Sequence, residues 1–71
     1  MRPNPKKFGR NLTRLRNARG LNQAQLAKAV GVSQACISQW ESGKVWPSVP
    51  KSQALARFFR ISADWLLFQS M

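Results

Sequence analysis

Cationic side chains dominate the residues of this chain that could do chemistry. Of its 71 residues, 12 are Lys or Arg, 2 are Asp or Glu, none is His and one, Cys36, is Cys. This set excludes a His-based catalytic triad, a His/Cys metal site and an internal disulfide. We therefore expect no enzyme, no metal and no cofactor. The formal net charge of +10 favours a polyanionic partner, and nucleic acid is the commonest polyanion in a cell.

The basic side chains are concentrated near the N-terminus. The first 19 residues contain no acid and include Arg2, Lys6, Lys7, Arg10, Arg14, Arg16 and Arg19. Taken alone, this run is compatible with a solvated face or with an arm that adheres to any RNA, DNA or anionic lipid. Only the pattern of the remaining residues distinguishes these alternatives.

The length of the chain predicts one small domain over residues 1–71. Such a domain has a single core and no room for a deep cleft, so we expect no small-molecule ligand. No apolar run approaches the roughly 20 residues that span a bilayer, and residues 1–10 lack the apolar segment of a signal peptide. These features predict a cytoplasmic protein without a membrane partner.

Short helices with recognisable caps must position the charges. Asn4 and Pro5 begin a helix that Gly20 ends. The apolar residues of this helix share one face: Phe8, Leu12 and Leu15. A fourth helix is expected between Trp46 and Ile61, with Ser48 as its cap and Pro50 in its first turn. The apolar stripe that faces inward on this helix is Leu55, Phe58 and Phe59.

A second pattern occurs three times, in which an apolar residue precedes a capping residue and another apolar residue lies four places after the cap. It predicts helices over 22–30, 33–42 and 62–68, capped by Asn22, Ser33 and Ser62. Gln25 completes a capping box with Asn22, and Gly43 ends the helix over 33–42. Since no segment alternates apolar and polar residues as a strand does, the predicted fold is all-α with five helices.

The helices over 22–30 and 33–42 are separated only by Gly31 and Val32, which is too short for an antiparallel pair. They must cross steeply, and this requires a small residue at the contact, Ala27, and a residue that accepts positive φ, Gly31. Such a crossing over about 22–42 is the arrangement of a DNA-binding helix-turn-helix, whose second helix enters the major groove.

The segment LNQAQLAKAVGVSQACISQWESGKVWPS, followed later by ISADWLL, resembles the lambda repressor-like (Cro and cI type) helix-turn-helix family over residues 8–68. The resemblance implies a sequence-specific transcription regulator of a bacterium or phage, most simply a repressor. Such a protein binds double-stranded DNA at a palindromic operator as a homodimer, and in the cell it is nucleoid-associated when bound.

The resemblance also assigns roles to individual residues. Base contacts are expected from Gln34, Ala35, Ser38 and Gln39. The two glutamines can each form a bidentate hydrogen bond to adenine, and the Ala35 methyl can contact the methyl group of thymine. Ser38 can contact a base or a phosphate. Phosphate contacts are expected from Arg16, from Asn22 and Gln23, and from Ser42, Gly43 and Lys44. Arg16 and Glu41 also match an ion pair that joins the first and third helices in some relatives.

We expect the homodimer to be weak without DNA, because two strongly cationic protomers repel each other until DNA neutralises them. The expected dimer surface lies in the C-terminal half, which has more apolar bulk than a small core needs. Its residues are Trp46, Phe58, Phe59, Leu67 and Phe68. For Trp46 a place at the edge of the core or in the dimer contact is favoured over an approach to the DNA backbone. Cys36 is expected to be a semi-buried filler.

Two other functions remain open at this point. One is an antitoxin-like or adaptor module that mainly binds a protein partner, with DNA binding secondary. The other is non-specific coating of nucleic acid, driven by charge alone. A titration with competitor DNA separates them, because a specific reader resists excess random DNA and a coating protein does not.

Overall fold

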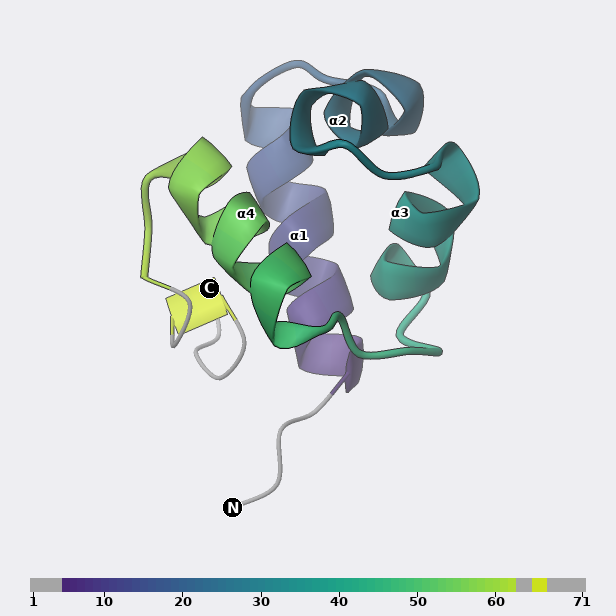
Figure 1. Cartoon of the computed structure of the whole chain (residues 1–71). Helices are drawn as coiled ribbons and strands as arrows, with labels where there is room; N and C mark the ends of the chain where they lie inside the picture. The colour runs from purple at the N-terminus through teal and green to yellow at the C-terminus, as the bar shows by residue number, and fades with distance from the viewer. Residues whose placement is uncertain (1–4, 63–64, 67–71) are drawn as a thin grey trace.

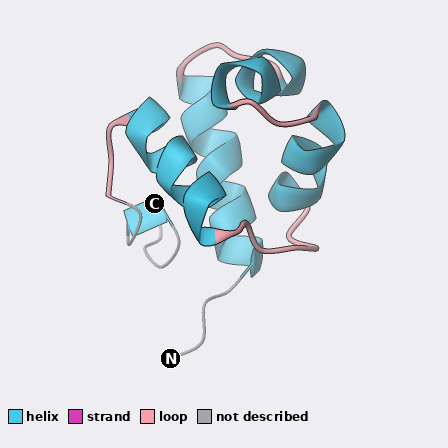
Figure 2. Ribbon diagram, viewed as in Figure 1, coloured by secondary structure: helices cyan, strands magenta, loops and turns pink. Residues whose placement is uncertain are grey.

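The computed structural model describes residues 5–62 and 65–66, and these contain four helices (Figure 1). They are α1 (Pro5–Ala18), α2 (Gln23–Val30), α3 (Gln34–Glu41) and α4 (Val49–Phe59). Loops connect the helices, and no strand occurs in this part of the chain (Figure 2). The all-α class predicted from the sequence is therefore confirmed.

The predicted fifth helix, over 62–68, falls largely on residues 63–64 and 67–71, which lie outside the described residues, as does the predicted cap Asn4. The described ranges thus contain four helices, not five. Within them, the Trp65 N–H donates to Ser62 Oγ at 3.0 Å and the Leu66 N–H donates to the Ser62 carbonyl at 3.2 Å.

The predicted caps account for where the helices begin. Asn22 Oδ1 accepts from the Gln25 N–H at 2.7 Å, and the Asn22 N–H donates to Gln25 Oε1 at 2.8 Å. This reciprocal pair is the predicted capping box. Ser33 Oγ accepts from the Cys36 N–H at 3.1 Å at the start of α3. Ser48 caps α4, and Pro50 lies in the first turn, where a missing N–H is tolerated.

All four helices contribute to the core. Helix α1 packs against α3, and α2 packs against both α3 and α4. The members of the core are apolar and almost fully buried: Phe8, Leu12, Leu26, Ala27, Ile37, Trp40, Leu55, Ala56, Phe59 and Leu66. The Asn11 Nδ2 amide donates to the carbonyl of Leu66 at 3.1 Å inside this core. The bond attaches α1 to a residue far along the chain.

Gly9 lets α1 and α3 approach each other more closely than any other residue would. It is buried, and a Cβ added there would lie 2.6 Å from the Trp40 carbonyl oxygen and 2.7 Å from the Glu41 carbonyl oxygen. These are backbone atoms at the end of α3, so a side chain could be accommodated only if a whole helix moved. The absence of a side chain at Gly9 therefore sets the distance between the two helices.

Gly9→Ala should lower the free energy of unfolding, although alanine is the better helix former. Helix propensity gains about 1 kcal/mol, whereas overpacking typically costs about 1–3 kcal/mol and here involves rigid backbone. Urea unfolding of wild type and variant measures the balance. The exposed position 53 of α4 provides the control, because Gln53→Ala and Gln53→Gly should differ by the ordinary propensity alone. A stabilised Gly9→Ala protein would contradict the close approach.

Candidate nucleic-acid interface

The turn between α2 and α3 has the geometry that the sequence predicted. Gly31 ends α2 with φ of 79° and ψ of 34°, in the left-handed region that favours glycine. The N–H groups of Gly31 and Val32 both donate to the Ala27 carbonyl at 2.9 Å. Ala27 is 3% exposed, so a small, buried side chain lies where the two helices meet. The chain turns sharply here and directs α3 away from α2 (Figure 1).

The outer face of α3 carries the side chains that were expected to read bases. Gln34, Ala35, Ser38 and Gln39 are all exposed. The opposite face is anchored in the core, with Ile37 fully buried and Trp40 only 2% exposed. The fold thus presents two amides, a methyl group and a hydroxyl on one uncharged helical surface. These groups match the hydrogen-bonding and methyl pattern of base edges in a major groove.

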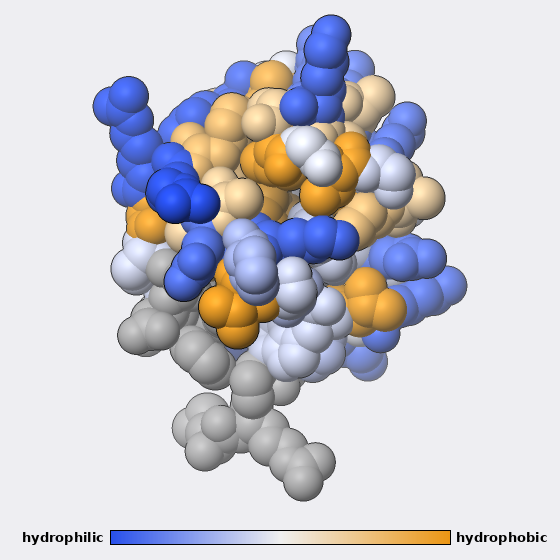
Figure 3. Space-filling view, viewed as in Figure 1, coloured by the Kyte–Doolittle hydropathy of each residue, from blue (hydrophilic) through white to orange (hydrophobic). Residues whose placement is uncertain are grey.

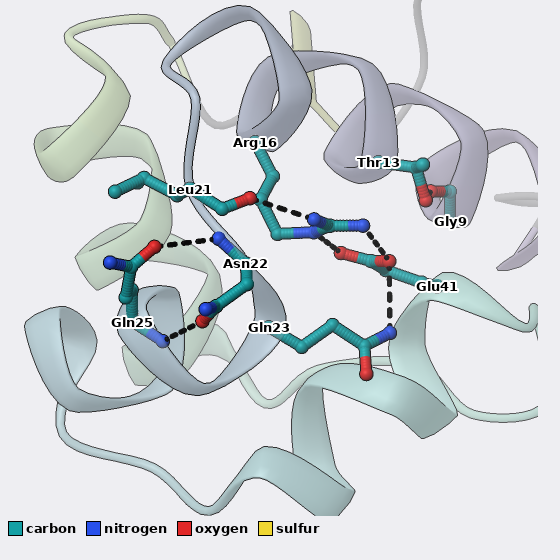
Figure 4. A network of polar contacts seen from close by, with 8 residues as sticks. All are labelled: Gly9, Thr13, Arg16, Leu21, Asn22, Gln23, Gln25 and Glu41. Atoms are coloured by element: carbon teal, nitrogen blue, oxygen red, sulfur yellow. Dashed lines mark hydrogen bonds and ion pairs between the residues drawn. The ribbon is translucent and has the colours of Figure 1, made fainter.

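An ion pair between Arg16 and Glu41 connects α1 to the end of α3 (Figure 4). Arg16 Nε donates to Glu41 Oε2 at 2.6 Å, and Arg16 Nη2 donates to Glu41 Oε1 at 3.0 Å. A third donor of the guanidinium, Nη1, bonds the Leu21 carbonyl at 2.8 Å. The two side chains are 13% and 7% exposed, so water screens the pair little. The expected pair is present, and its bidentate geometry is the strongest that Arg and a carboxylate form.

The hydrogen bonds that Arg16 donates to Glu41 raise the pKa of Arg16 above its ordinary value. Burial acts in the opposite direction and the negative charge of Glu41 reinforces the rise. Because the pKa moves upward, the guanidinium stays charged wherever the protein is folded at ordinary pH. Arg16 was also expected to contact phosphate, and the structure commits three of its nitrogens to Glu41 and Leu21. That phosphate contact stays a prediction.

Gln23, the first residue of α2, joins the same network. Its Nε2 donates to Glu41 Oε1 at 3.1 Å, so the side chain reaches across to α3 (Figure 4). The Oδ1 and N–H of Asn22 are used by the capping box. The first expected phosphate anchor therefore has its side chains oriented by contacts within the protein, and its phosphate contacts stay a prediction.

The second expected anchor, Ser42 to Lys44, follows α3. The N–H groups of Ser42, Gly43 and Lys44 donate back to carbonyls of α3. The Ser42 hydroxyl also donates, to the Gln39 carbonyl at 2.8 Å. The backbone donors of this segment are thus already used, which leaves the exposed Lys44 side chain as its cationic group.

The expected dimer surface needs one correction. Phe59 is 4% exposed and belongs to the core, so it cannot be part of a surface between protomers. Phe58 is half-buried, with the Arg19 guanidinium carbon 5.4 Å from its ring centroid. Trp46 is half-buried and packs on Phe8 with ring centroids 5.6 Å apart, which places it at the edge of the core. Leu67 and Phe68 lie outside the described residues.

Sequence reasoning missed the role of Arg19. It was counted with the basic residues available to a partner, yet its guanidinium donates to the carbonyls of Phe58 and Phe59 at 3.4 and 3.3 Å. A cation at these carbonyls complements the negative end of α4. The sequence offered two weak signals for this contact. Arg19 follows directly after one helix, and an aromatic pair ends another.

Three properties of the described residues bear on other kinds of site. No three His, Cys, Asp or Glu side chains lie together there in a group that could hold a metal ion. None of the helices in residues 5–62 and 65–66 is long and apolar enough to cross a membrane. Cys36 is a free thiol of intermediate exposure on α3.

Comparison with known proteins identifies the family. The helix-turn-helix family HTH_3 matches residues 12–66, and this chain belongs to it. The predicted resemblance to the Cro and cI type of regulator is therefore confirmed. The chain is 40% identical over 60 residues to the HTH-type transcriptional activator BcrR of Enterococcus faecalis, which covers 84% of the chain and 29% of that protein.

Phage proteins are similar in both sequence and structure. The chain is 36% identical over 64 residues to the repressor protein C2 of Salmonella phage P22, which covers 90% of the chain and 30% of that protein. It therefore spans less than a third of either full-length relative. The crystal structure of the P22 c2 repressor in complex with a synthetic operator superposes with a TM-score of 0.84 at 35% identity, covering 89% of this chain and 96% of that one.

Glu41→Gln should lower the free energy of unfolding by about 3 kcal/mol, because it leaves the largely buried Arg16 charge without a counter-charge. Urea unfolding measures the loss. The matched control is Gln23→Ala, which removes only one bond to the same carboxylate and should cost about 1 kcal/mol. A loss below 1 kcal/mol in Glu41→Gln would mean that water screens the pair.

Proposed function

We propose that this chain is a sequence-specific DNA-binding module of a transcription regulator, most simply a repressor that occupies its operator. The observation that carries the proposal is the outer face of α3, whose exposed amides lie on a helix anchored by Ile37 and Trp40. The P22 c2 repressor, whose backbone this chain shares, was crystallised on a synthetic operator. In the proposed complex α3 lies in the major groove. The protein binds this DNA in the cytoplasm.

Affinity and specificity come from different residues in this proposal. The net charge of +10 supplies attraction to phosphates, which depends on salt and not on sequence. In this proposal Arg16, Gln23 and Lys44 contribute phosphate contacts around the groove, together with the side chains of Asn22 and Ser42. Gly43 shapes the turn there, because its N–H already donates to the Trp40 carbonyl. Gln34, Gln39, Ala35 and Ser38 select the site through base edges.

Selection of bound sequences from a random DNA pool tests the proposal directly. A specific regulator enriches one motif, and a palindromic motif with half-sites about 10 bp apart fits a dimer that follows one face of the duplex. A pool that stays random after repeated rounds would contradict sequence reading and favour charge-driven coating.

Gln34→Ala or Gln39→Ala should weaken binding to the selected duplex by about 1–3 kcal/mol and change binding to a random duplex little, because only a matched base pair loses hydrogen bonds. Fluorescence anisotropy on both duplexes measures the effect. The control is Gln53→Ala, the same substitution on the exposed side of α4. Equal losses on both duplexes would refute the assignment of base contacts to α3.

The same proposal includes assembly of two protomers on the operator. Val45, in the loop before α4, and Val49, the first residue of α4, are 39% and 68% exposed, so this region offers apolar surface to a second copy. Apolar patches also lie among hydrophilic side chains on the face that carries α4 (Figure 3). A fifth helix that begins at Ser62, supported by the two bonds to Trp65 and Leu66, would extend this half of the protein.

Sedimentation at physiological salt should show mostly monomer without DNA and two protomers on each selected duplex, because DNA neutralises the charges that keep protomers apart. Val49→Ser should reduce this pairing on DNA, whereas Gln53→Ser, also exposed on α4, should not. A tight dimer in the absence of DNA would contradict the proposed role of charge repulsion.

A further inference from the structure

A basic side chain from the first turn of α1 lies beside the turn that follows α3. A Cβ added at Gly43 would lie 2.9 Å from Lys6 Cγ and 3.0 Å from Lys6 Cα. Gly43 has φ of 79°, and this left-handed turn brings the chain after α3 back against α1. Lys6 and Lys44 are both exposed. Two lysines from distant parts of the sequence therefore flank one turn.

This turn cannot attract an anion through its backbone. The N–H groups of Ser42, Gly43 and Lys44 donate to the carbonyls of Ser38, Trp40 and Gln39. The C-terminus of a helix also carries partial negative charge, which repels phosphate. Since α3 has no basic residue in its last turn, a phosphate here would have to be held by cations from outside the helix.

The first turn of α1 places positive charge where the helix disfavours it. A helix N-terminus is stabilised by acids, yet this turn contains Lys6 and Lys7 and no acid. A local preference that is broken in this way is most often found at a functional site.

We propose that Lys6 and Lys44 form a phosphate clamp, which holds the DNA backbone at the C-terminal end of α3. The ammonium of Lys6 is three bonds beyond the Cγ that lies against Gly43, so it can reach an anion shared with Lys44. The clamp rests on the proposed DNA binding and adds to it a contact from α1. Because it recognises only phosphate, it acts equally on every DNA sequence.

The salt dependence of binding tests the clamp. Each phosphate contact adds about −0.9 to the slope of log affinity against log salt. Lys6→Gln should therefore make the slope less steep by about 0.9 for each bound protomer. Between about 50 and about 200 mM salt, the advantage of wild type over the variant should shrink about 3.5-fold for each phosphate contact that the substitution removes. Lys6→Arg, which keeps the charge, should retain the wild-type slope.

The matched control is Arg57→Gln, which removes one exposed charge from the last turn of α4. That turn lies near Arg19, at the opposite end of α1 from Lys6. Its slope should equal that of wild type. The thermal midpoint of Lys6→Gln is measured beside that of wild type, because Lys6 also has an interaction within the protein that the substitution removes. The thermal midpoint therefore separates disruption of the clamp from disruption of the fold.

The experiment uses the selected duplex and a random duplex of equal length. A reduced slope on both duplexes for Lys6→Gln, with Arg57→Gln unchanged, supports the clamp. Equal slopes for wild type and Lys6→Gln overturn it, and so do equal reductions in Lys6→Gln and Arg57→Gln. The salt slope on the random duplex tests the clamp even if the wild-type protein does not discriminate between sequences. Failure of the clamp and failure of sequence reading therefore give different results.

Discussion

The carboxylate of Glu41 holds three helices in one relative position. It accepts from Arg16 on α1 and from Gln23 on α2, and it is itself the last residue of α3. Removing two charges from water is costly, and an ion pair of this kind contributes more to a defined geometry than to net stability. That geometry is what the exposed face of α3 requires, because its side chains can match a rigid partner only if the helix is held at one angle.

The cations of the protein and the uncharged polar groups on the outer face of α3 lie on different surfaces. The outer face of α3 carries amide, methyl and hydroxyl groups, and α3 itself contains no Lys or Arg. The cations lie on the surrounding elements, from Lys6 on α1 to Lys44 after α3. A lysine on the outer face of α3 would bind any phosphate within reach and dilute the preference for a matched base pair. In the proposed complex, the neutral face lets the amides discriminate between base pairs while the surrounding cations supply affinity.

Local rules in the sequence were sufficient for the helices and their caps. The Asn22 and Gln25 box, the Ser33 and Ser48 caps and the Gly31 turn depend on residues close together in the chain, so spacing reveals them. Contacts between distant residues left no such signal. Nothing nearby in the chain marks Gly9, although it sets the approach of α3. Phe59 was expected both on the inward stripe of its helix and on the dimer surface, and only the first position is correct. Gln23 and Arg19 also have partners that only the fold brings near.

The angle between α2 and α3 is fixed at two points. At one, the Gly31 turn joins the end of α2 to the start of α3, and both of its N–H bonds go to Ala27. At the other, the hydrogen bond from Gln23 to Glu41 joins the start of α2 to the end of α3. With the turn alone, the C-terminal end of α3 would be held only by its core packing, through Ile37 and Trp40, and a shift of that end displaces the exposed side chains by more than a hydrogen bond tolerates. The second attachment limits that shift, and for this reason a polar network away from the exposed glutamines controls how accurately they can be placed.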